Sequence, residues 1–277
     1  MGGSPAHASN QPKKQRETTT MSILTTTADG ILTITFNRLE RKNAITGAMY
    51  QTMADALRAA EQDTTIRAIL ITGQPEIFTA GNDLDDFLNN TGEGAMTPER
   101  PVFQFMLALE GCTKPVVAAV AGAAVGIGTT LLMHCDLVYA ADNAKFSMPF
   151  SQLGLCPEFA SSLLVAQSAG YTRAAEKLML GEPFLAQEAL EMGIVARVVP
   201  AAELLAFAQA QAAKLVKLPP ASIRTTKALM RRARTAHVRD TIAAENEQFS
   251  AMLGGAEAKE AFTAFFEKRK PDFSKFD

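Results

Sequence analysis

Two glycine-containing segments could present unpaired backbone N–H groups to a ligand. In Gly126-Ile127-Gly128 the glycines let a ligand approach the main chain closely, and the first N–H groups of the helix expected to follow have no partner within it. In residues 78–84 (FTAGNDL), small residues precede another expected helix, so the N–H of Asn82 could point out of the loop. If the fold brings both segments together, they would form an oxyanion hole. Glycines 126 and 128 are also compatible with a tight strand-to-helix turn in which they serve packing alone.

Carboxylates are the side chains that could transfer a proton beside such a hole. Glu158 lies among apolar neighbours in residues 153–162 (LGLCPEFASS). From spacing alone, it could instead open a helix over 159–168, because acids are favoured in a first helical turn. Three rival acids follow the first loop, where we expect them to cap or solvate its helix: Asp83, Asp85 and Asp86.

Metal and histidine chemistry have little support in the sequence. The three histidines are scattered and follow neither an HExxH nor a Cys/His spacing. His134 lies in an expected apolar helix and is interpreted as a packed histidine with a satisfied ring. The three cysteines, an odd number at wide spacing, fit neither a disulfide framework nor a zinc knuckle and favour a reducing cytosol: Cys112, Cys135 and Cys156.

An α/β framework is predicted to position these candidate residues. Residues 22–27 and 31–37 indicate a β-hairpin around Asp29-Gly30, and a helix with Thr46 as its N-cap should follow. Short apolar segments predict three further strands, at 67–72, 114–120 and 137–141. Because strands alternate with helices, we expect a mostly parallel sheet.

Length and composition exclude several classes of protein. A chain of 277 residues, 47% hydrophobic and 20% charged, is too apolar for intrinsic disorder and lacks the long apolar run of a membrane span. Its 27 basic and 29 acidic side chains give a net charge of -2, which leaves no positive field to hold a nucleic-acid backbone. We therefore expect a soluble globular protein with no nucleic-acid and no membrane partner.

The two ends of the chain differ from this body. Residues 1–20 have no apolar periodicity and are expected to stay disordered. After Val199 the strand signals stop, and helices are predicted at 201–217, 221–233, 239–253 and 257–268.

Two side-chain groups stand out on the predicted C-terminal helices. Phe262, Phe265 and Phe266 form an apolar stripe that something must cover. The basic residues of an earlier helix are interpreted as a solvated face, since the chain has neither the basic excess nor the interleaved aromatics of a nucleic-acid site: Lys227, Arg231 and Arg234.

From about residue 21 to residue 273 the sequence resembles the crotonase family, the enoyl-CoA hydratase/isomerase superfamily. The motifs are NRLERKNAIT (37–46), IFTAGNDL (77–84), KPVVAAVAGAAVGIG (114–128), CDLVYAADNAKFSMPFSQLGL (135–155) and AFFEKRKPDF (264–273). The resemblance implies an α/β fold of the ClpP/crotonase-like type, a spiral of ββα units with a C-terminal helical trimerisation region. It divides the chain into a disordered extension (1–20), an α/β core (21–200) and a C-terminal helical region (201–277).

The resemblance also implies a reaction. In this family two backbone N–H groups hold the thioester oxygen of an acyl-CoA, and by motif position these belong to Asn82 and Ile127. Hydratases of the family use two glutamates, at positions that here hold Thr130 and Phe150, neither of which can shuttle a proton at neutral pH. The LG-x-x-PE-x-x-SS stretch instead resembles the monofunctional Δ3,Δ2-enoyl-CoA isomerases, in which the glutamate, here Glu158, is the single base. The implied activity is the isomerisation of 3-enoyl-CoA to trans-2-enoyl-CoA.

Substrate contacts and assembly follow from the same resemblance. Residues 93–105 and the helix after Asp83 should shape the acyl pocket, and Lys42 and Lys268 should lie near the CoA phosphates. No metal and no cofactor beyond the CoA of the substrate are expected. The chain should form a homotrimer or a hexamer (a dimer of trimers). It ends in Ser-Lys-Phe-Asp rather than Ser-Lys-Leu, so the three-residue peroxisomal address is absent, and with the cysteine pattern we expect a cytoplasmic protein. The full set of expected substrate-binding residues is Lys42, Ala80, Asp83, Leu84, Gly126, Phe150, Leu155 and Lys268.

Two alternatives stay open at this point. One is hydration or another acyl-CoA lyase reaction on the same fold. The other is a non-catalytic CoA-binding or RNA-binding relative that kept the fold.

Overall fold

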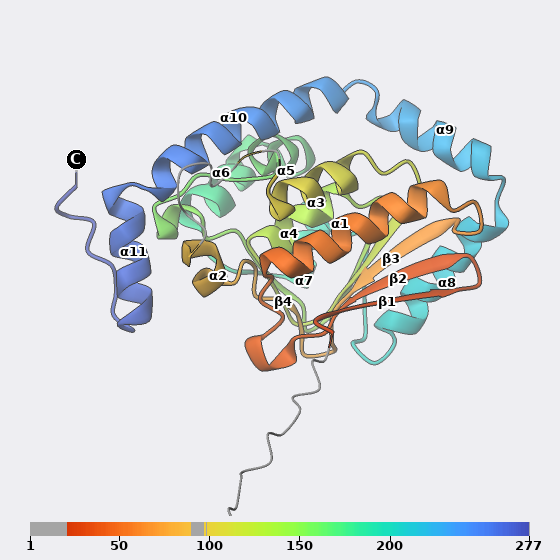
Figure 1. Cartoon of the computed structure of the whole chain (residues 1–277), viewed down its shortest axis with the longest axis horizontal. Coiled ribbons are helices and arrows are strands. Elements are labelled where there is room, and N and C mark those ends of the chain that lie inside the picture. The colour runs from red at the N-terminus through yellow and green to blue at the C-terminus, as the bar shows by residue number, and fades with distance from the viewer. Residues whose placement is uncertain (1–20, 90–96, 98, 277) are drawn as a thin grey trace, which may run out of the picture.

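The structure, a computed structural model, describes residues 21–89, 97 and 99–276 (Figure 1). The disorder expected for residues 1–20 lies outside the described residues, as does part of the 93–105 segment expected at the acyl pocket.

A six-stranded sheet is the main element of the fold. Its order is β1-β2-β3-β5-β7-β10, and every neighbouring pair is parallel except the β1–β2 hairpin, as the alternation of elements predicted. The hairpin turns at Asp29 and Gly30, which have φ angles of 52° and 77°. The strands are β1 (Ile23–Ala28), β2 (Ile31–Phe36), β3 (Ala68–Thr72), β5 (Val116–Val120), β7 (Leu137–Ala141) and β10 (Arg197–Val199).

A second, four-stranded sheet has the order β4-β6-β8-β9. Its strands are β4 (Ile77–Thr79), β6 (Ala123–Val125), β8 (Lys145–Ser147) and β9 (Phe184–Leu185). β4, β6 and β8 pair in parallel, so their carboxyl ends lie at one edge. The sequence analysis did not predict these strands, because two or three residues are too few to show a periodicity of two.

Helices cover the sheets, and the first begins as predicted. The Thr46 hydroxyl accepts a hydrogen bond from the Met49 N–H at 3.4 Å and caps α1. The helix expected after Gly128 is only one turn long and continues as a 3-10 turn. This part of the chain contains α1 (Gly47–Gln62), α2 (Leu84–Asn89), α3 (Pro101–Glu110), α4 (Ile127–Thr130), α5 (Ser161–Ala169), α6 (Tyr171–Leu180) and α7 (Ala186–Glu191), with 3-10 turns η1 (Leu39–Arg41), η2 (Leu131–His134) and η3 (Ser151–Leu153).

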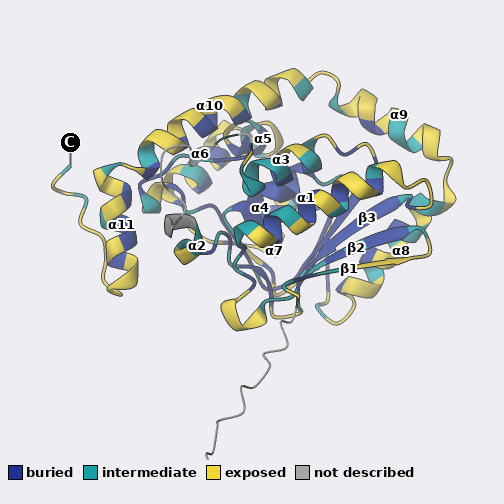
Figure 2. Ribbon diagram, viewed as in Figure 1, coloured by how far each residue is buried: buried dark blue, intermediate teal, exposed yellow. Residues whose placement is uncertain are grey.

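The C-terminal helices wrap around this body (Figure 1). They are α8 (Leu204–Lys217), α9 (Pro220–Arg231), α10 (Thr235–Leu253) and α11 (Ala256–Phe266). α8 packs Leu204, Ala208 and Ala212 against the main sheet, whereas α10 lies over α5 and leads to α11 at one end of the molecule. Figure 2 shows that β2 and β3 are largely buried, that the edge strand β1 is mostly exposed, and that these helices are exposed on their outer sides. In the described ranges, every helix is too short or too polar to cross a bilayer.

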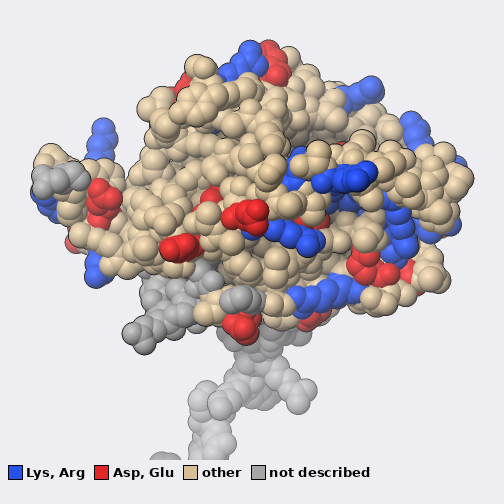
Figure 3. Space-filling view, turned by 90° about the horizontal axis from the view of Figure 1, so that it is seen from above, with Lys and Arg blue, Asp and Glu red and all other residues tan. Residues whose placement is uncertain are grey.

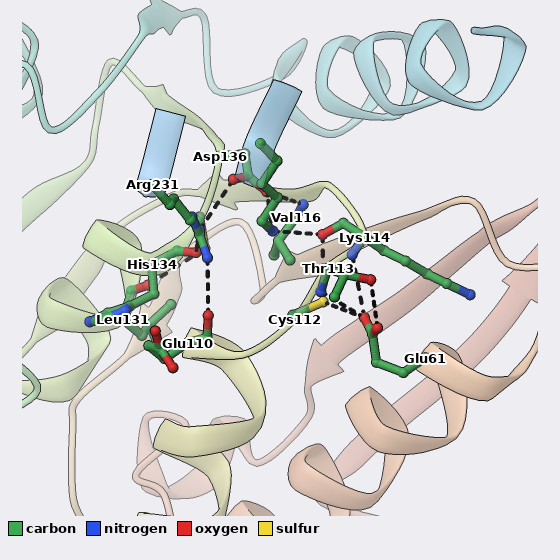
Figure 4. Close-up of polar contacts among 12 residues, drawn as sticks. Glu61, Glu110, Cys112, Thr113, Lys114, Val116, Leu131, His134, Asp136 and Arg231 are labelled. Carbon is green, nitrogen blue, oxygen red and sulfur yellow. Dashed lines mark hydrogen bonds and ion pairs between the residues drawn. The ribbon is translucent and has the colours of Figure 1, made fainter. Parts of the chain in front are cut away.

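The basic residues of α9 do not form the solvated face that the sequence suggested. Lys227 is 5% exposed, and its Nζ donates to the Lys114 carbonyl at 2.7 Å and to the Asp136 carboxylate at 2.6 Å. Arg231 pairs with Asp136 at 3.2 Å and donates to the His134 carbonyl at 2.6 Å (Figure 4). These bonds join α9 to the loops that enter β5 and β7. On the face seen in Figure 3, acidic and basic side chains are interspersed.

Candidate active site

A cavity of about 650 Å³ lies where the carboxyl ends of β4 and β6 face the C-terminal helices. Among the residues predicted from sequence, Lys268 alone does not line it. α11 ends at Phe266, and the exposed Lys268 follows with a φ of 55°. The others all contribute to its walls: Lys42, Ala80, Asn82, Asp83, Leu84, Gly126, Ile127, Phe150, Leu155 and Glu158.

The Asn82 N–H is positioned by the backbone on either side of it. The Ala80 N–H donates to the Lys42 carbonyl at 3.0 Å, and the Asp83 N–H donates to the Ile45 carbonyl at 2.9 Å. Successive N–H groups of an extended chain point to opposite sides. The Asn82 N–H therefore points away from Ile45, and it has no backbone acceptor within the described chain.

Ile127 is the first residue of α4, which is a single helical turn. Gly126, which has a φ of 55°, donates its N–H to the Ser147 carbonyl at 2.9 Å and ends the strand pairing. The next N–H belongs to the first helical residue and has no acceptor inside the helix. Ile127 itself is fully buried, and it lines the cavity.

Strand pairing brings the two donor loops together. Asn82 follows the end of β4 by three residues, and Ile127 follows the end of β6 by two. The loops also pack closely: a Cβ on Gly81 would lie 2.8 Å from the Val125 carbonyl oxygen, and one on Gly128 would lie 2.5 Å from a Thr79 methyl carbon. Only glycine permits this approach, so the glycines have a packing role as well as leaving both N–H groups at the cavity.

Two residues that the sequence analysis missed hold the Asn82 loop. Asn43 is fully buried, and its Nδ2 donates to the carbonyls of Ile77 and Phe78, both at 3.1 Å. The Tyr50 hydroxyl, from α1, donates to the Asn82 side-chain oxygen. Asn43 lies within the NRLERKNAIT motif, whereas nothing in the local sequence marks Tyr50 as part of the site.

Glu158 is the buried acid of the cavity. Its side chain is 1% exposed and lines the wall, and its Oε1 has no hydrogen-bond partner among the described residues. Burial raises the pKa of this carboxyl from 4.5 to about 8, with a further contribution from the charge of Glu245. A carboxyl with this pKa is protonated at neutral pH and, once ionised, is a stronger base than an exposed one.

The backbone after Glu158 adopts an unusual conformation. Phe159 and Ala160 both have left-handed φ angles, 59° and 55°, and α5 begins only at Ser161. The alternative in which Glu158 opens a helix over 159–168 is therefore wrong. Glu158 instead belongs to a turn whose strained backbone places its side chain in the cavity wall.

The rival acids of the first loop are engaged elsewhere. Asp83 pairs with Arg38 at 2.5 Å and accepts the Asp86 N–H at 3.1 Å, so it caps α2 as expected. Burial would raise the pKa of Asp83, but its bonds with Arg38 and Asp86 outweigh burial and lower it. Asp85 pairs with Arg41 at 2.6 Å. Among the residues lining the cavity, Glu158 is thus the carboxylate without a cationic partner.

The opposite wall is aromatic and comes from the C-terminal helices. Phe249 of α10 and Phe262 of α11 are buried, whereas Phe265 and Phe266 are 59% and 49% exposed and also line the cavity. Of the three phenylalanines of the predicted apolar stripe, Phe262 is therefore covered and the other two are not. The exposed Lys42 lies on the wall near the Asn82 loop, with a φ of 52°.

His134 has a structural role in this arrangement. Its ring stacks on Phe159 with centroids 3.7 Å apart, and its Nε2 contacts the Phe159 carbonyl at 2.8 Å. Burial lowers its pKa to about 3, so the ring is neutral and Nε2–H is the donor. In the described ranges, no group of three or more His, Cys, Asp or Glu side chains is placed to hold a metal ion.

The combined geometry suits chemistry next to a carbonyl group. Two main-chain N–H groups can stabilise negative charge on an oxygen, at about 3 to 4 kcal/mol per donor. A buried carboxyl with a raised pKa can accept a proton from the neighbouring carbon. The cavity is large enough for a drug-sized ligand, and its long apolar wall favours an acyl chain or a pantetheine arm.

Comparisons with known proteins identify the family to which this chain is similar. A family model described as Enoyl-CoA hydratase/isomerase matches residues 26–275. The chain is 31% identical over 243 residues to a 2,3-dehydroadipyl-CoA hydratase of Escherichia coli (strain K12), covering 88% of this chain and 94% of that protein. It is 40% identical over 213 residues to Enoyl-CoA delta isomerase 2 of Rattus norvegicus, covering 76% of this chain but only 54% of that longer protein. An enoyl-CoA hydratase/isomerase structure from Pseudoalteromonas atlantica T6c superposes with a TM-score of 0.86 at 40% identity, covering 91% of this chain and 100% of that one.

Proposed function

The chain belongs to the enoyl-CoA hydratase/isomerase family and has the crotonase fold, and from this premise we propose that it converts 3-enoyl-CoA to trans-2-enoyl-CoA. Relatives named as hydratases and relatives named as isomerases both match the chain, so family membership alone leaves the reaction open. The observation that carries the proposal is Glu158, the one carboxylate without a cationic partner among the described residues that line the cavity, beside two backbone N–H donors.

In the first step, ionised Glu158 removes a proton from C2 of the substrate. The electrons of the C2–H bond form a C1–C2 double bond, and negative charge moves to the thioester oxygen. The N–H groups of Asn82 and Ile127 hydrogen-bond to that oxygen and stabilise the dienolate. Because both donors belong to the main chain, this stabilisation needs no particular side chain at either position.

In the second step, the protonated Glu158 returns the proton at C4. The C3–C4 double bond supplies the electrons for the new C4–H bond, and the C1–C2 electrons form the C2–C3 double bond as the thioester carbonyl is restored. A buried carboxyl can hold the proton between the steps, since its pKa of about 8 keeps it protonated at neutral pH. In this proposal CoA enters with the substrate, no separate cofactor takes part, and Lys42 lies near the phosphates.

Hydration is the second candidate, because a hydratase of similar length is among the relatives. Adding water needs one group to activate the water and another to deliver a proton. By motif position, Thr130 and Phe150 replace the two glutamates of family hydratases, and neither side chain can activate water or deliver a proton. The proposal therefore favours a proton shift over water addition.

Product analysis tests the choice between these reactions. Purified protein is incubated with 3-enoyl-CoA and, separately, with 2-enoyl-CoA, and the products are separated by chromatography. We expect the double bond to move in the first case and no 3-hydroxyacyl-CoA in the second. Glu158→Gln should abolish turnover yet bind acyl-CoA nearly as well, whereas Glu247→Gln, which removes an exposed carboxylate of α10, should be as active as wild type. Accumulation of 3-hydroxyacyl-CoA, or full activity of Glu158→Gln, would refute the proposal.

A further inference from the structure

Glu245, on α10, contacts the chain on both sides of Glu158. Its Oε2 accepts the Ala160 N–H at 2.5 Å, and its Oε1 accepts the N–H and the hydroxyl of Ser162, at 3.0 Å and 2.5 Å. Its backbone carbonyl accepts a hydrogen bond from the Cys156 thiol at 3.6 Å. The segment that contains Glu158 is therefore held by one residue of a helix that is remote in sequence.

The segment needs such contacts because its backbone is strained. Two consecutive non-glycine residues with left-handed φ angles persist only where surrounding structure holds them. His134 holds Phe159 from one side, by stacking and by the bond to its carbonyl. Glu245 holds Ala160 from the other side, and together these contacts define where the Glu158 side chain points.

The two buried acids differ in their hydrogen bonding. Glu245 is 7% exposed and accepts three hydrogen bonds, whereas the Oε1 of Glu158 has no partner in the part of the chain that the structure describes. Donors favour the ionised form of a carboxyl, and two neighbouring buried carboxyls resist ionising together. Burial raises the pKa of Glu245 as well, but its hydrogen bonds with Ser162 and Ala160 oppose that rise, whereas only the charge of Glu245 adds to the effect of burial on Glu158. Glu245 therefore ionises first, and Glu158 carries the proton.

Asp83 and Asp85 line the same cavity but are paired with Arg38 and Arg41, and three other titratable groups near Glu158 stay neutral between about pH 5 and 9. Tyr50 faces it from α1, and burial raises the pKa of this hydroxyl well above its ordinary value. Cys156 precedes it in the same loop, and burial raises the pKa of that thiol to about 11. His134, behind Phe159, has a pKa lowered by burial to about 3. In the described chain, this leaves Glu245 as the charge that acts on Glu158.

From these contacts we propose that Glu245 is a positioning residue for Glu158, holding the turn that aims it and keeping the proton on it as the ionised partner of a buried carboxyl pair. The inference rests on the proposed function for what Glu158 does to the substrate. How Glu158 is held does not depend on that reaction.

Three variants in the full-length protein test the proposal. Glu245→Gln removes the charge and cannot accept at both backbone N–H groups, Glu245→Asp keeps the charge but shortens its reach, and Glu247→Gln removes an exposed charge from the same helix. Thermal melts followed by circular dichroism identify the variants that fold. Two readouts are measured against pH: kcat and kcat/KM for 3-enoyl-CoA, and the ¹³C resonance of the Glu158 carboxyl, assigned by its loss in Glu158→Gln.

For Glu245→Gln we expect the acidic limb of kcat/KM and the NMR titration to move together to lower pH. A shift of half a pH unit, about threefold in the ionised fraction at pH 6, is the smallest that supports the proposal. At high pH, kcat should fall about ten- to hundredfold while KM changes less than about twofold, because a misaimed base loses transition-state stabilisation more than binding. Glu247→Gln should match wild type in both readouts.

Other outcomes separate the two proposals. An unshifted NMR titration in Glu245→Gln overturns the inference, whereas a shifted titration in a protein that never isomerises 3-enoyl-CoA overturns the proposed function alone. A fall in kcat without a change in either titration indicates a merely structural role and also overturns the inference. If Glu245→Gln does not fold, Glu245→Asp carries the test of positioning. Because aspartate keeps the charge, the titration midpoint should stay at its wild-type value while kcat falls and KM changes less than about twofold, and an unchanged kcat refutes positioning.

Discussion

Replacing Glu158 by glutamine should change how the stability of the protein depends on pH, independently of any activity. The carboxyl is 1% exposed, and burial together with the charge of Glu245 raises its pKa from 4.5 to about 8. The unfolded chain releases this proton near pH 4.5, whereas the folded protein keeps it until about pH 8. The contribution of the Glu158 carboxyl to the free energy of unfolding of the wild type is thus fully present below about pH 4.5 and is lost as the pH rises through 8.

The size of the loss follows from the pKa difference. One pKa unit corresponds to about 1.4 kcal/mol. Because the pKa rises from 4.5 to about 8, the wild type loses about 3 to 5 kcal/mol of its free energy of unfolding above pH 8. Glutamine never ionises, so the variant escapes this loss. The free energy of unfolding of Glu158→Gln, relative to wild type, should therefore increase by about 3 to 5 kcal/mol between pH 4.5 and 9, a large part of a typical folding stability.

Urea unfolding at fixed protein concentration measures this difference. Curves are recorded from pH 4.5 to pH 9 for wild type, Glu158→Gln and the control Glu247→Gln, whose carboxylate is exposed on α10. The control should parallel wild type at every pH. A difference between Glu158→Gln and wild type that stays constant within about 0.5 kcal/mol over the whole range would show that Glu158 does not titrate in a buried site.

Two further substitutions test the hole and the attachment of α9. Gly81→Ala places a Cβ 2.8 Å from the Val125 carbonyl oxygen, at a residue whose φ is 88°, so the Asn82 N–H must move. We expect kcat to fall about ten- to hundredfold in steady-state assays. An unchanged kcat would contradict the assignment of the Asn82 N–H as a donor. Lys227→Met leaves the partly buried Asp136 carboxylate with one cation fewer and should cost about 2 to 4 kcal/mol in urea unfolding. A loss below about 1 kcal/mol would mean that the pair is more exposed than described.

The main sheet and the donor loops could be predicted because their signals are local. Residues 67–72, 114–120 and 137–141 are apolar runs that only a buried strand explains well, and each contains a strand of the main sheet. The glycines at 81 and 126 indicated loops at which a ligand can approach the main chain, and both loops reach the cavity.

What escaped prediction depends on contacts between distant residues. β4 and β6 have three residues each and form only because they pair with each other and with β8. Left-handed φ angles at Phe159 and Ala160 have no sequence signal, since neither is glycine or asparagine. From the sequence, Lys227 is interpreted as part of a solvated face, and no sequence pattern marks Glu245. Only the folded chain shows that their partners lie more than 80 residues away.

The pairing of β4 with β6 has a consequence for how such a protein can diversify. Adjacent strands lie about 4.8 Å apart whatever side chains they carry, so the spacing between the chain segments that lead to the amides of Asn82 and Ile127, the proposed oxygen-binding pair, is set by main-chain geometry. Mutations at Asn82 or Ile127 can reshape the space around a bound acyl group while the amides remain. New chemistry would then require only that acids be gained or lost elsewhere on the cavity wall.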